Sequence, residues 1–201
     1  MWRRVAILIV CGLAVIVAVW TSATPAAERF PDPTRALQAP ETCHPLETGN
    51  PRTFEELTAL LVTRLGESRL DCGASNADEE YRLTWGQAFD THRITVTVVR
   101  TGDVVLAETR EYAGQGPAPK LLSARERRIA SPEWTRVRTR LANIEFWNLQ
   151  PEPITVNDGS TWTLEGRAAG RYHLVWRQSP PDSPFRRVAL DLLRLGGIRR
   201  P

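Results

Sequence analysis

Apolar and polar residues alternate along several short stretches of the chain, which is the pattern of a strand with one buried face. Three such stretches follow one another at residues 81–85, 93–100 and 104–112, and the sequence TGD between the last two predicts a tight turn. Two more lie at residues 161–165 and 171–177. The pattern therefore predicts a three-stranded antiparallel meander that is followed, after an interval, by a β-hairpin.

Three other stretches carry apolar residues three or four positions apart, as one face of an α-helix does. They lie at residues 53–66, 131–144 and 183–196. Thr53 with Glu56 forms a capping box for the first helix, and a capping serine followed by a first-turn proline opens each of the others. Helices and strands together predict an α+β domain, in which three helices pack on one face of an antiparallel sheet of about five strands.

The N-terminus has the parts of a bacterial export signal. Arg3 and Arg4 precede an uninterrupted apolar run over residues 5–20, and small residues follow around Ala23 and Ala26. One interpretation is a cleaved signal peptide. The alternative is an uncleaved signal anchor, because the run is close to the roughly 17-residue minimum of a membrane-spanning helix. The two arginines stay on the cytoplasmic side, so both interpretations place everything after residue 27 outside the cytoplasm.

The chain is predicted to have three parts. Residues 1–26 are the signal peptide or signal anchor, and residues 5–23 hold the protein at the membrane if they are not removed. Residues 27–52 are rich in proline and poor in apolar residues, which indicates an extended spacer. Residues 53–201 form one α+β domain, since a chain of 201 residues is long enough for one domain and short for two.

The cysteines agree with an oxidising compartment outside the cytoplasm. Cys11 lies in the apolar run, which leaves Cys43 and Cys72 on either side of the first helix, and we expect these two to form a disulfide. The alternative is a metal site made of Cys43, His44 and Cys72. The absence of a short-spaced ligand pair such as C-x-x-C favours the disulfide, and no metal is predicted. A lipoprotein box around Cys11 is disfavoured because Val10 is bulky where such boxes have a small residue.

The net charge of +3 does not indicate a nucleic-acid-binding protein. Of the 26 basic residues, Arg3 and Arg4 belong to the export signal, which leaves 24 against 23 acidic residues. The domain thus lacks the excess positive charge that phosphate contacts require. The sequence RERR at residues 125–128 forms a local basic cluster with the neighbouring Arg136, Arg138 and Arg140. We interpret this cluster as the solvated face of a helix rather than as a contact for anionic lipid or glycan.

The hairpin at residues 161–177 carries the one candidate for chemistry. If Trp162 and Trp176 share its core face, Glu165 and His173 lie together on the other face, as neighbours across the hairpin. A carboxylate beside an imidazole raises the basicity of the imidazole and fixes its tautomer, as a general base requires. The same pair can be an ordinary cross-strand contact on a solvated face, and this interpretation is favoured.

Other catalytic arrangements are missing from the sequence. No G-x-S-x-G motif, phosphate-binding glycine loop, zincin helix or calcium loop occurs. The three histidines, His44, His92 and His173, lie far apart along the chain. No cofactor is therefore predicted.

Three stretches near the C-terminus, IEFWNL, DGSTWTLEGRAAGRYHLVWRQSP and LDLLRLGG, resemble a recurring segment of exported bacterial proteins to which no activity is assigned. The resemblance covers roughly residues 144–196. It depends chiefly on Trp162, Leu164, Glu165, Tyr172, His173 and Pro180. It implies a shared fold and no activity.

These observations predict a periplasmic or extracellular protein of the bacterial envelope that binds a partner and catalyses no reaction. An envelope protein or a glycan is the expected partner. The seven tryptophans suit sugar stacking, but four of them lie on predicted core stripes: Trp85, Trp134, Trp162 and Trp176. The alternative function is a small exported hydrolase or transferase that uses Glu165 and His173.

Overall fold

The structure, a computed structural model, describes most of the predicted domain. The described residues are 54–72, 75–87, 91–114, 119–150, 152 and 159–199. The predicted export signal, the spacer and Cys43 lie outside them. Within these ranges no helix is both long and apolar enough to cross a membrane.

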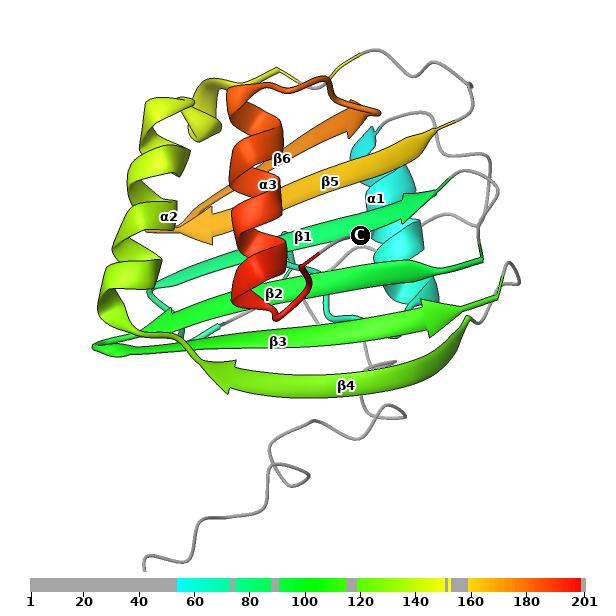
Figure 1. The fold of residues 1–201 in the computed structure, drawn as a ribbon, viewed down its shortest axis with the longest axis horizontal. Helices are drawn as coiled ribbons and strands as arrows, with labels where there is room; N and C mark the ends of the chain where they lie inside the picture. Colours follow the sequence, from blue (N-terminus) through cyan, green and yellow to red (C-terminus); the bar gives the residue numbers. More distant parts are fainter. Residues whose placement is uncertain are drawn as a thin grey trace, which may run out of the picture. The chain divides into compact units, whose positions relative to one another are not determined.

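One antiparallel sheet forms the centre of the domain, with its strands in the spatial order β4-β3-β2-β1-β5-β6 (Figure 1). The strands are β1 (Glu79–Gln87), β2 (Arg93–Thr101), β3 (Val104–Ala113), β4 (Lys120–Arg128), β5 (Ser160–Ala168) and β6 (Arg171–Gln178). The predicted meander is β1–β3 and the predicted hairpin is β5–β6, and pairing of β1 with β5 joins the two groups. The α+β fold is confirmed, with six strands rather than about five.

The additional strand, β4, is an edge strand that the alternation pattern does not reveal. Every residue of β4 except Ser123 is exposed, so neither face of this strand needs an apolar stripe. It is held by pairing with β3, from Leu106 opposite Arg128 to Ala113 opposite Lys120. The interpretation of residues 125–128 as a helix face is therefore wrong. Their charges lie on a sheet edge, where they discourage the addition of further strands.

The three helices begin close to the predicted positions: α1 (Phe54–Arg64), α2 (Ser131–Asn143) and α3 (Pro184–Leu195), with a short 3-10 helix, η2 (Phe146–Asn148). Ser183 caps α3 as expected, because its hydroxyl accepts a hydrogen bond from the Arg186 N–H at 3.2 Å. The expected cap of α2 is wrong. Ser131 is already helical, the N-cap is Ala130, and the Ala130 N–H donates to the Glu133 carboxylate instead.

The helices cover both faces of the sheet. Figure 1 shows α2 and α3 together on one face and α1 behind the other. The main apolar core lies under α2 and α3, where Leu83, Val96 and Leu164 of the sheet meet Val137 and Leu192 of the helices, each 2% exposed or less. The prediction that all helices pack on one face is therefore wrong for α1. A face that was expected to be solvated is covered instead.

Candidate functional site

Glu165 and His173 do not meet, because their side chains point to opposite faces of the sheet. The hairpin turn consists of Ala169 and Gly170, both with positive φ, which is the geometry of a type I′ turn. The resulting register sets Glu165 opposite Leu174, so Leu174 shares the face of Glu165 and His173 lies on the other. The hypothesis of a general base formed by this pair is therefore wrong.

The same register separates aromatic residues that we expected on one core face. Trp162 lies on the face of α3, where the guanidinium of Arg186 is 5.8 Å from its ring. Tyr172 and Trp176 lie on the face of α1, with Glu165. Trp162 and Trp176 are both buried as predicted, but in two different layers.

His173 is part of an aromatic cluster beside η2. Its ring centroid lies 5.2 Å from that of Phe146 and 6.4 Å from that of Trp147, and its Nε2 is 2.9 Å from the carbonyl oxygen of Leu149. A carbonyl oxygen only accepts hydrogen bonds, so Nε2 carries the proton of this bond. The contacts make His173 a structural residue that joins β6 to the segment after α2.

Glu165 belongs to a buried ion pair on the α1 face. Arg82 of β1 is 1% exposed and donates from Nε and Nη2 to the two carboxylate oxygens of Glu165, at 2.8 and 3.2 Å. The Tyr172 hydroxyl donates to the same carboxylate at 3.1 Å, and Arg82 Nη1 donates to the Ser68 carbonyl at 2.6 Å. Burial lowers the pKa of Arg82, but Glu165 and Glu67 outweigh it and raise the pKa overall, so the guanidinium stays charged.

Glu67, in the loop after α1, extends this ion pair across the sheet. Its carboxylate is 4.0 Å from Arg82, and it accepts hydrogen bonds from the hydroxyls of Tyr112 at 2.6 Å and Thr95 at 2.8 Å. Arg110 approaches it at 3.4 Å. Burial raises the pKa of Tyr112, and the neighbouring Glu67 raises it further.

We refer to these side chains as the buried network, which consists of Glu67, Arg82, Thr95, Arg110, Tyr112, Glu165 and Tyr172. None of their polar atoms is left buried without a hydrogen-bond partner. Its charges are matched within the network, and it ties the loop after α1 to five strands: β1, β2, β3, β5 and β6. In the described part of the chain, no group of three or more His, Cys, Asp or Glu residues could hold a metal ion. Because its charges and hydrogen bonds are satisfied within the network, we interpret the buried network as structural.

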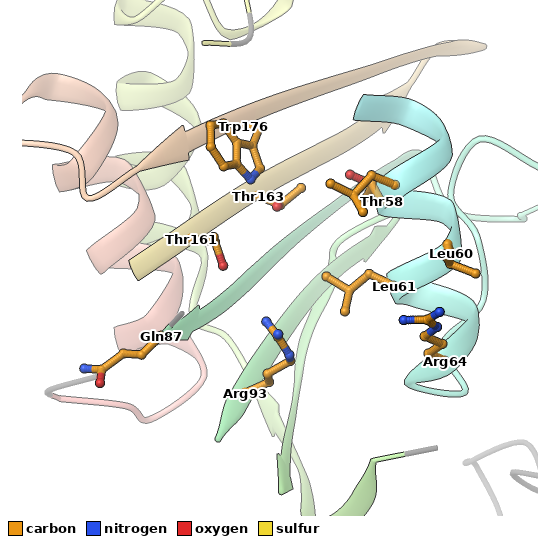
Figure 2. Close-up of a pocket in the computed structure, with 10 residues that line it drawn as sticks. Thr58, Leu60, Leu61, Arg64, Gln87, Arg93, Thr161, Thr163 and Trp176 are labelled. Atoms are coloured by element: carbon orange, nitrogen blue, oxygen red, sulfur yellow. The ribbon is translucent and has the colours of Figure 1, made fainter. Parts of the chain in front are cut away.

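A cavity of about 230 Å³, which we call the α1 cavity, lies beside the buried network, between α1 and the sheet (Figure 2). It is lined by Leu57, Thr58, Leu60, Leu61 and Arg64 of α1, and by Gln87, Arg93, Thr161, Thr163 and Trp176 of the sheet. The volume is below the roughly 300 Å³ at which sites for drug-sized ligands begin. The cavity thus suits a small molecule that offers both apolar and polar contacts.

Arg93 supplies the positive charge of the α1 cavity. Figure 2 shows its guanidinium reaching from β2 toward the space between Leu61 and Thr161. It lies over Gly86, its neighbour on β1, where a Cβ atom would be only 2.6 Å from Arg93 Nη1. A glycine at this position therefore lets the guanidinium lie against the strand. Burial lowers the pKa of Arg93, which means that the charged form is incompletely solvated.

No carboxylate of the described residues compensates this charge. Within the described ranges neither Arg93 nor Arg64 makes an ion pair or a side-chain hydrogen bond. No acidic side chain of the described residues lines the α1 cavity. The α1 cavity therefore combines two cationic groups with an apolar wall, and this combination favours an anion that carries an apolar part.

A buried hydroxyl next to the α1 cavity is also unsatisfied. Thr84 of β1 is 3% exposed, and its Oγ1 has no hydrogen-bond partner. The register places it between Thr163 of β5 and Thr95 of β2, on the face covered by α1. Thr163 lines the cavity and Thr95 belongs to the buried network, so a row of hydroxyls connects the two.

Cys72 takes part in a disulfide bond and is buried at the end of the loop after α1. The expected partner, Cys43, lies outside the described residues, so their pairing stays a prediction.

The sequence contained no direct signal for the site. Arg82 and Arg93 occupy polar positions of alternating strands, which we interpreted as solvent-facing. An arginine at a polar position of a strand is an ordinary feature of a solvated face, so only the placement of α1 distinguishes these two. The single local sign is Gly86, a strand glycine of the kind that marks a close approach of another group.

In comparisons with known proteins, no protein-family model, curated protein or solved structure matches this chain. The resemblance of residues 144–196 to exported bacterial proteins accordingly stays a prediction.

Proposed function

We propose that this chain is an exported binding module of the bacterial envelope that catalyses no reaction, and that the α1 cavity binds a small anion with an apolar part. The observation that carries the proposal is the guanidinium of Arg93, which is partly desolvated and unpaired within the described ranges. The loss of the Glu165–His173 pair supports the non-enzymatic interpretation. The export signal and the proline-rich spacer support a location in the periplasm or outside the cell.

An anion is favoured because the guanidinium of Arg93 is partly buried without an opposite charge from the described residues. A charged group that is partly removed from water loses hydration energy, and an opposite charge at hydrogen-bond distance restores it. A carboxylate that enters the α1 cavity meets Arg93 and can accept two parallel hydrogen bonds from it. The Thr163 hydroxyl can donate a further hydrogen bond to the same group, whereas the Thr161 hydroxyl already donates to the Gly86 carbonyl at 3.2 Å.

The apolar part of the ligand is recognised by α1. Leu57, Leu60 and Leu61 face the α1 cavity from the helix, and Trp176 closes it from β6. Leu57 is 37% exposed, which is high for a leucine on the covered side of a helix. A bound hydrocarbon chain removes this surface from water, at about 25 cal/mol for each Å² that is buried.

The test uses the exported protein and octanoate as the probe of this ligand class. Isothermal titration should detect octanoate and should detect octanol, which has the same chain without the charge, only more weakly. Arg93→Gln should weaken octanoate binding about tenfold, because a hydrogen bond to a charged group contributes roughly 1.5–3 kcal/mol, and should leave octanol unchanged. Arg171→Gln, whose guanidinium lies over the Trp147 ring on the other face of the sheet, is the matched control.

Two results would overturn this proposal. One is that octanoate binds no better than octanol. The other is that Arg93→Gln and Arg171→Gln bind octanoate equally well while both variants melt like the natural protein.

The location is tested separately. Alkaline phosphatase fused after residue 201 should be active in the producing bacterium, because this enzyme needs an oxidising compartment for its disulfides. An inactive fusion together with an active cytoplasmic reporter refutes export. The mass of the mature chain then distinguishes cleavage after Ala23 or Ala26 from an intact anchor.

A further inference from the structure

A second cavity lies on the opposite side of the sheet, where α3 ends beside β4. It has a volume of about 540 Å³ and is lined by Arg127, Arg194, Gly197 and Arg199. We call it the arginine cleft. Three of its four lining residues are arginines, and no acidic side chain lines it within the described ranges.

The arginines of the cleft keep free hydrogen-bond donors. Arg127 binds both carboxylate oxygens of Glu133 through Nη2 alone, at 2.8 Å. Arg194 binds Asp191 through Nη1 alone, at 2.8 Å. Arg199 has no ion pair or side-chain hydrogen bond with the described residues. A guanidinium has five N–H donors, so most donors of the cleft are available to a ligand.

The end of α3 does not repel an anion from the cleft as a bare helix C-terminus would. The carbonyl oxygen of Gly196 accepts hydrogen bonds from Thr109 Oγ1 at 2.9 Å and from Arg125 Nε at 3.2 Å. The carbonyl of Arg194 accepts the N–H of Gly197 at 2.9 Å. Gly197 has a φ of +80°, a conformation that glycine adopts readily, and it places no side chain in the cleft.

We propose that the arginine cleft binds a phosphate group, independently of the α1 cavity. Planar guanidinium groups match the oxygens of a phosphate through paired hydrogen bonds, and a phosphate has enough oxygens to serve several arginines at once. The cleft is also wider than a single phosphate needs. The phosphate therefore belongs to a larger molecule, which is either the headgroup of an anionic phospholipid or a soluble phosphate compound.

The experiment compares the exported protein with Arg194→Gln/Arg199→Gln and with Arg171→Gln/Arg187→Gln, a control that removes the same number of charges from residues outside the cleft. Removing Arg194 leaves Asp191 paired with Arg140, so the double variant should keep its thermal midpoint. Two probes are used at low salt: vesicles of phosphatidylglycerol in phosphatidylcholine against phosphatidylcholine alone, and inorganic pyrophosphate in titration calorimetry. The predicted N-terminal segment is identical in all variants, so the comparison between the double variant and the control does not depend on it.

Binding of at least one phosphate probe should weaken about tenfold or more in the double variant and stay unchanged in the control. It should also weaken as salt is added, because these are exposed charge contacts. A difference seen with vesicles alone identifies the lipid headgroup as the source, and one seen with pyrophosphate identifies a soluble phosphate. The proposal is overturned if neither probe binds, or if the control variant loses as much binding as the double variant. Neither outcome bears on the α1 cavity.

Discussion

The buried network makes a sharp prediction for Arg82→Met. Methionine fills a similar length of the Arg82 side chain but provides no charge and no donor. Glu165 then keeps only the Tyr172 hydroxyl as a partner in a site that is 2% exposed. Removing one partner of a buried ion pair typically costs about 3–5 kcal/mol, since the other charge stays buried without compensation. The substitution also removes the hydrogen bond from Arg82 to the Ser68 carbonyl, and this loss adds to the cost.

Two comparisons separate the effect of the unpaired charge from that of lost packing. Arg82→Met/Glu165→Leu removes both charges, and because well-packed apolar residues often replace a buried pair at little cost, it should be more stable than Arg82→Met alone. Arg187→Met removes an arginine from an exposed pair with Asp182, at 3.0 Å, and should change the free energy of unfolding by at most about 1 kcal/mol.

The assay is urea denaturation of the exported, oxidised protein, followed by tryptophan fluorescence and by circular dichroism to check two-state behaviour. Our interpretation of the buried network is refuted if Arg82→Met lies within about 1 kcal/mol of the natural protein. It is equally refuted if the double variant is no more stable than the single one.

Three further predictions follow from other parts of the structure. Burial raises the pKa of all three tyrosines, that of Tyr81 to about 12, so absorbance near 295 nm should show no tyrosinate in the folded protein at pH 10. These raised pKa values add to the free energy of unfolding below pH 10, and this contribution should be lost as the pH rises further. Reversible ionisation of one tyrosine near pH 10 without unfolding would contradict the prediction. Gly166→Ala should lower the free energy of unfolding by about 1–3 kcal/mol, because its Cβ would lie 2.6 Å from a ring atom of Phe146, and a thermal midpoint equal to that of the natural protein would exclude this contact. Peptide mapping without reductant should link Cys72 to Cys43, whereas a free thiol at Cys43 would disprove the pairing.

The elements that the sequence predicted well are those with one buried face. The helix at α3 has a clear apolar stripe, a capping serine and a glycine at its end, and it forms where expected. Strand β2 alternates cleanly between the apolar core and Thr95 and Thr97, so its location was readable. In contrast, β4 is exposed at almost every position, and a strand without a buried face leaves no periodic signal.

The hairpin shows why the candidate chemistry was misassigned. Trp162 and Trp176 both look like core residues, and placing them on one face is the simplest reading of alternation. A turn of two residues sets the register, however, and shifting a register by one residue moves every side chain of a strand to the other face. The turn contains Ala169 at a positive φ, a conformation that is rarely predicted for alanine. The separation of Glu165 from His173 could therefore not be predicted from the sequence.

The sequence by itself determined the class of fold, the limits of most elements and the expectation of export, because these depend on local periodicity, on capping residues and on an apolar segment near the N-terminus. Only the tertiary structure decided that α1 covers the second face of the sheet. That placement turns Arg82 and Glu165 from surface residues into the centre of a buried network, and it encloses Arg93 in a cavity. The physical reason is that burial is a property of what packs against a side chain, whereas the pattern along a strand records only which side chains share a face.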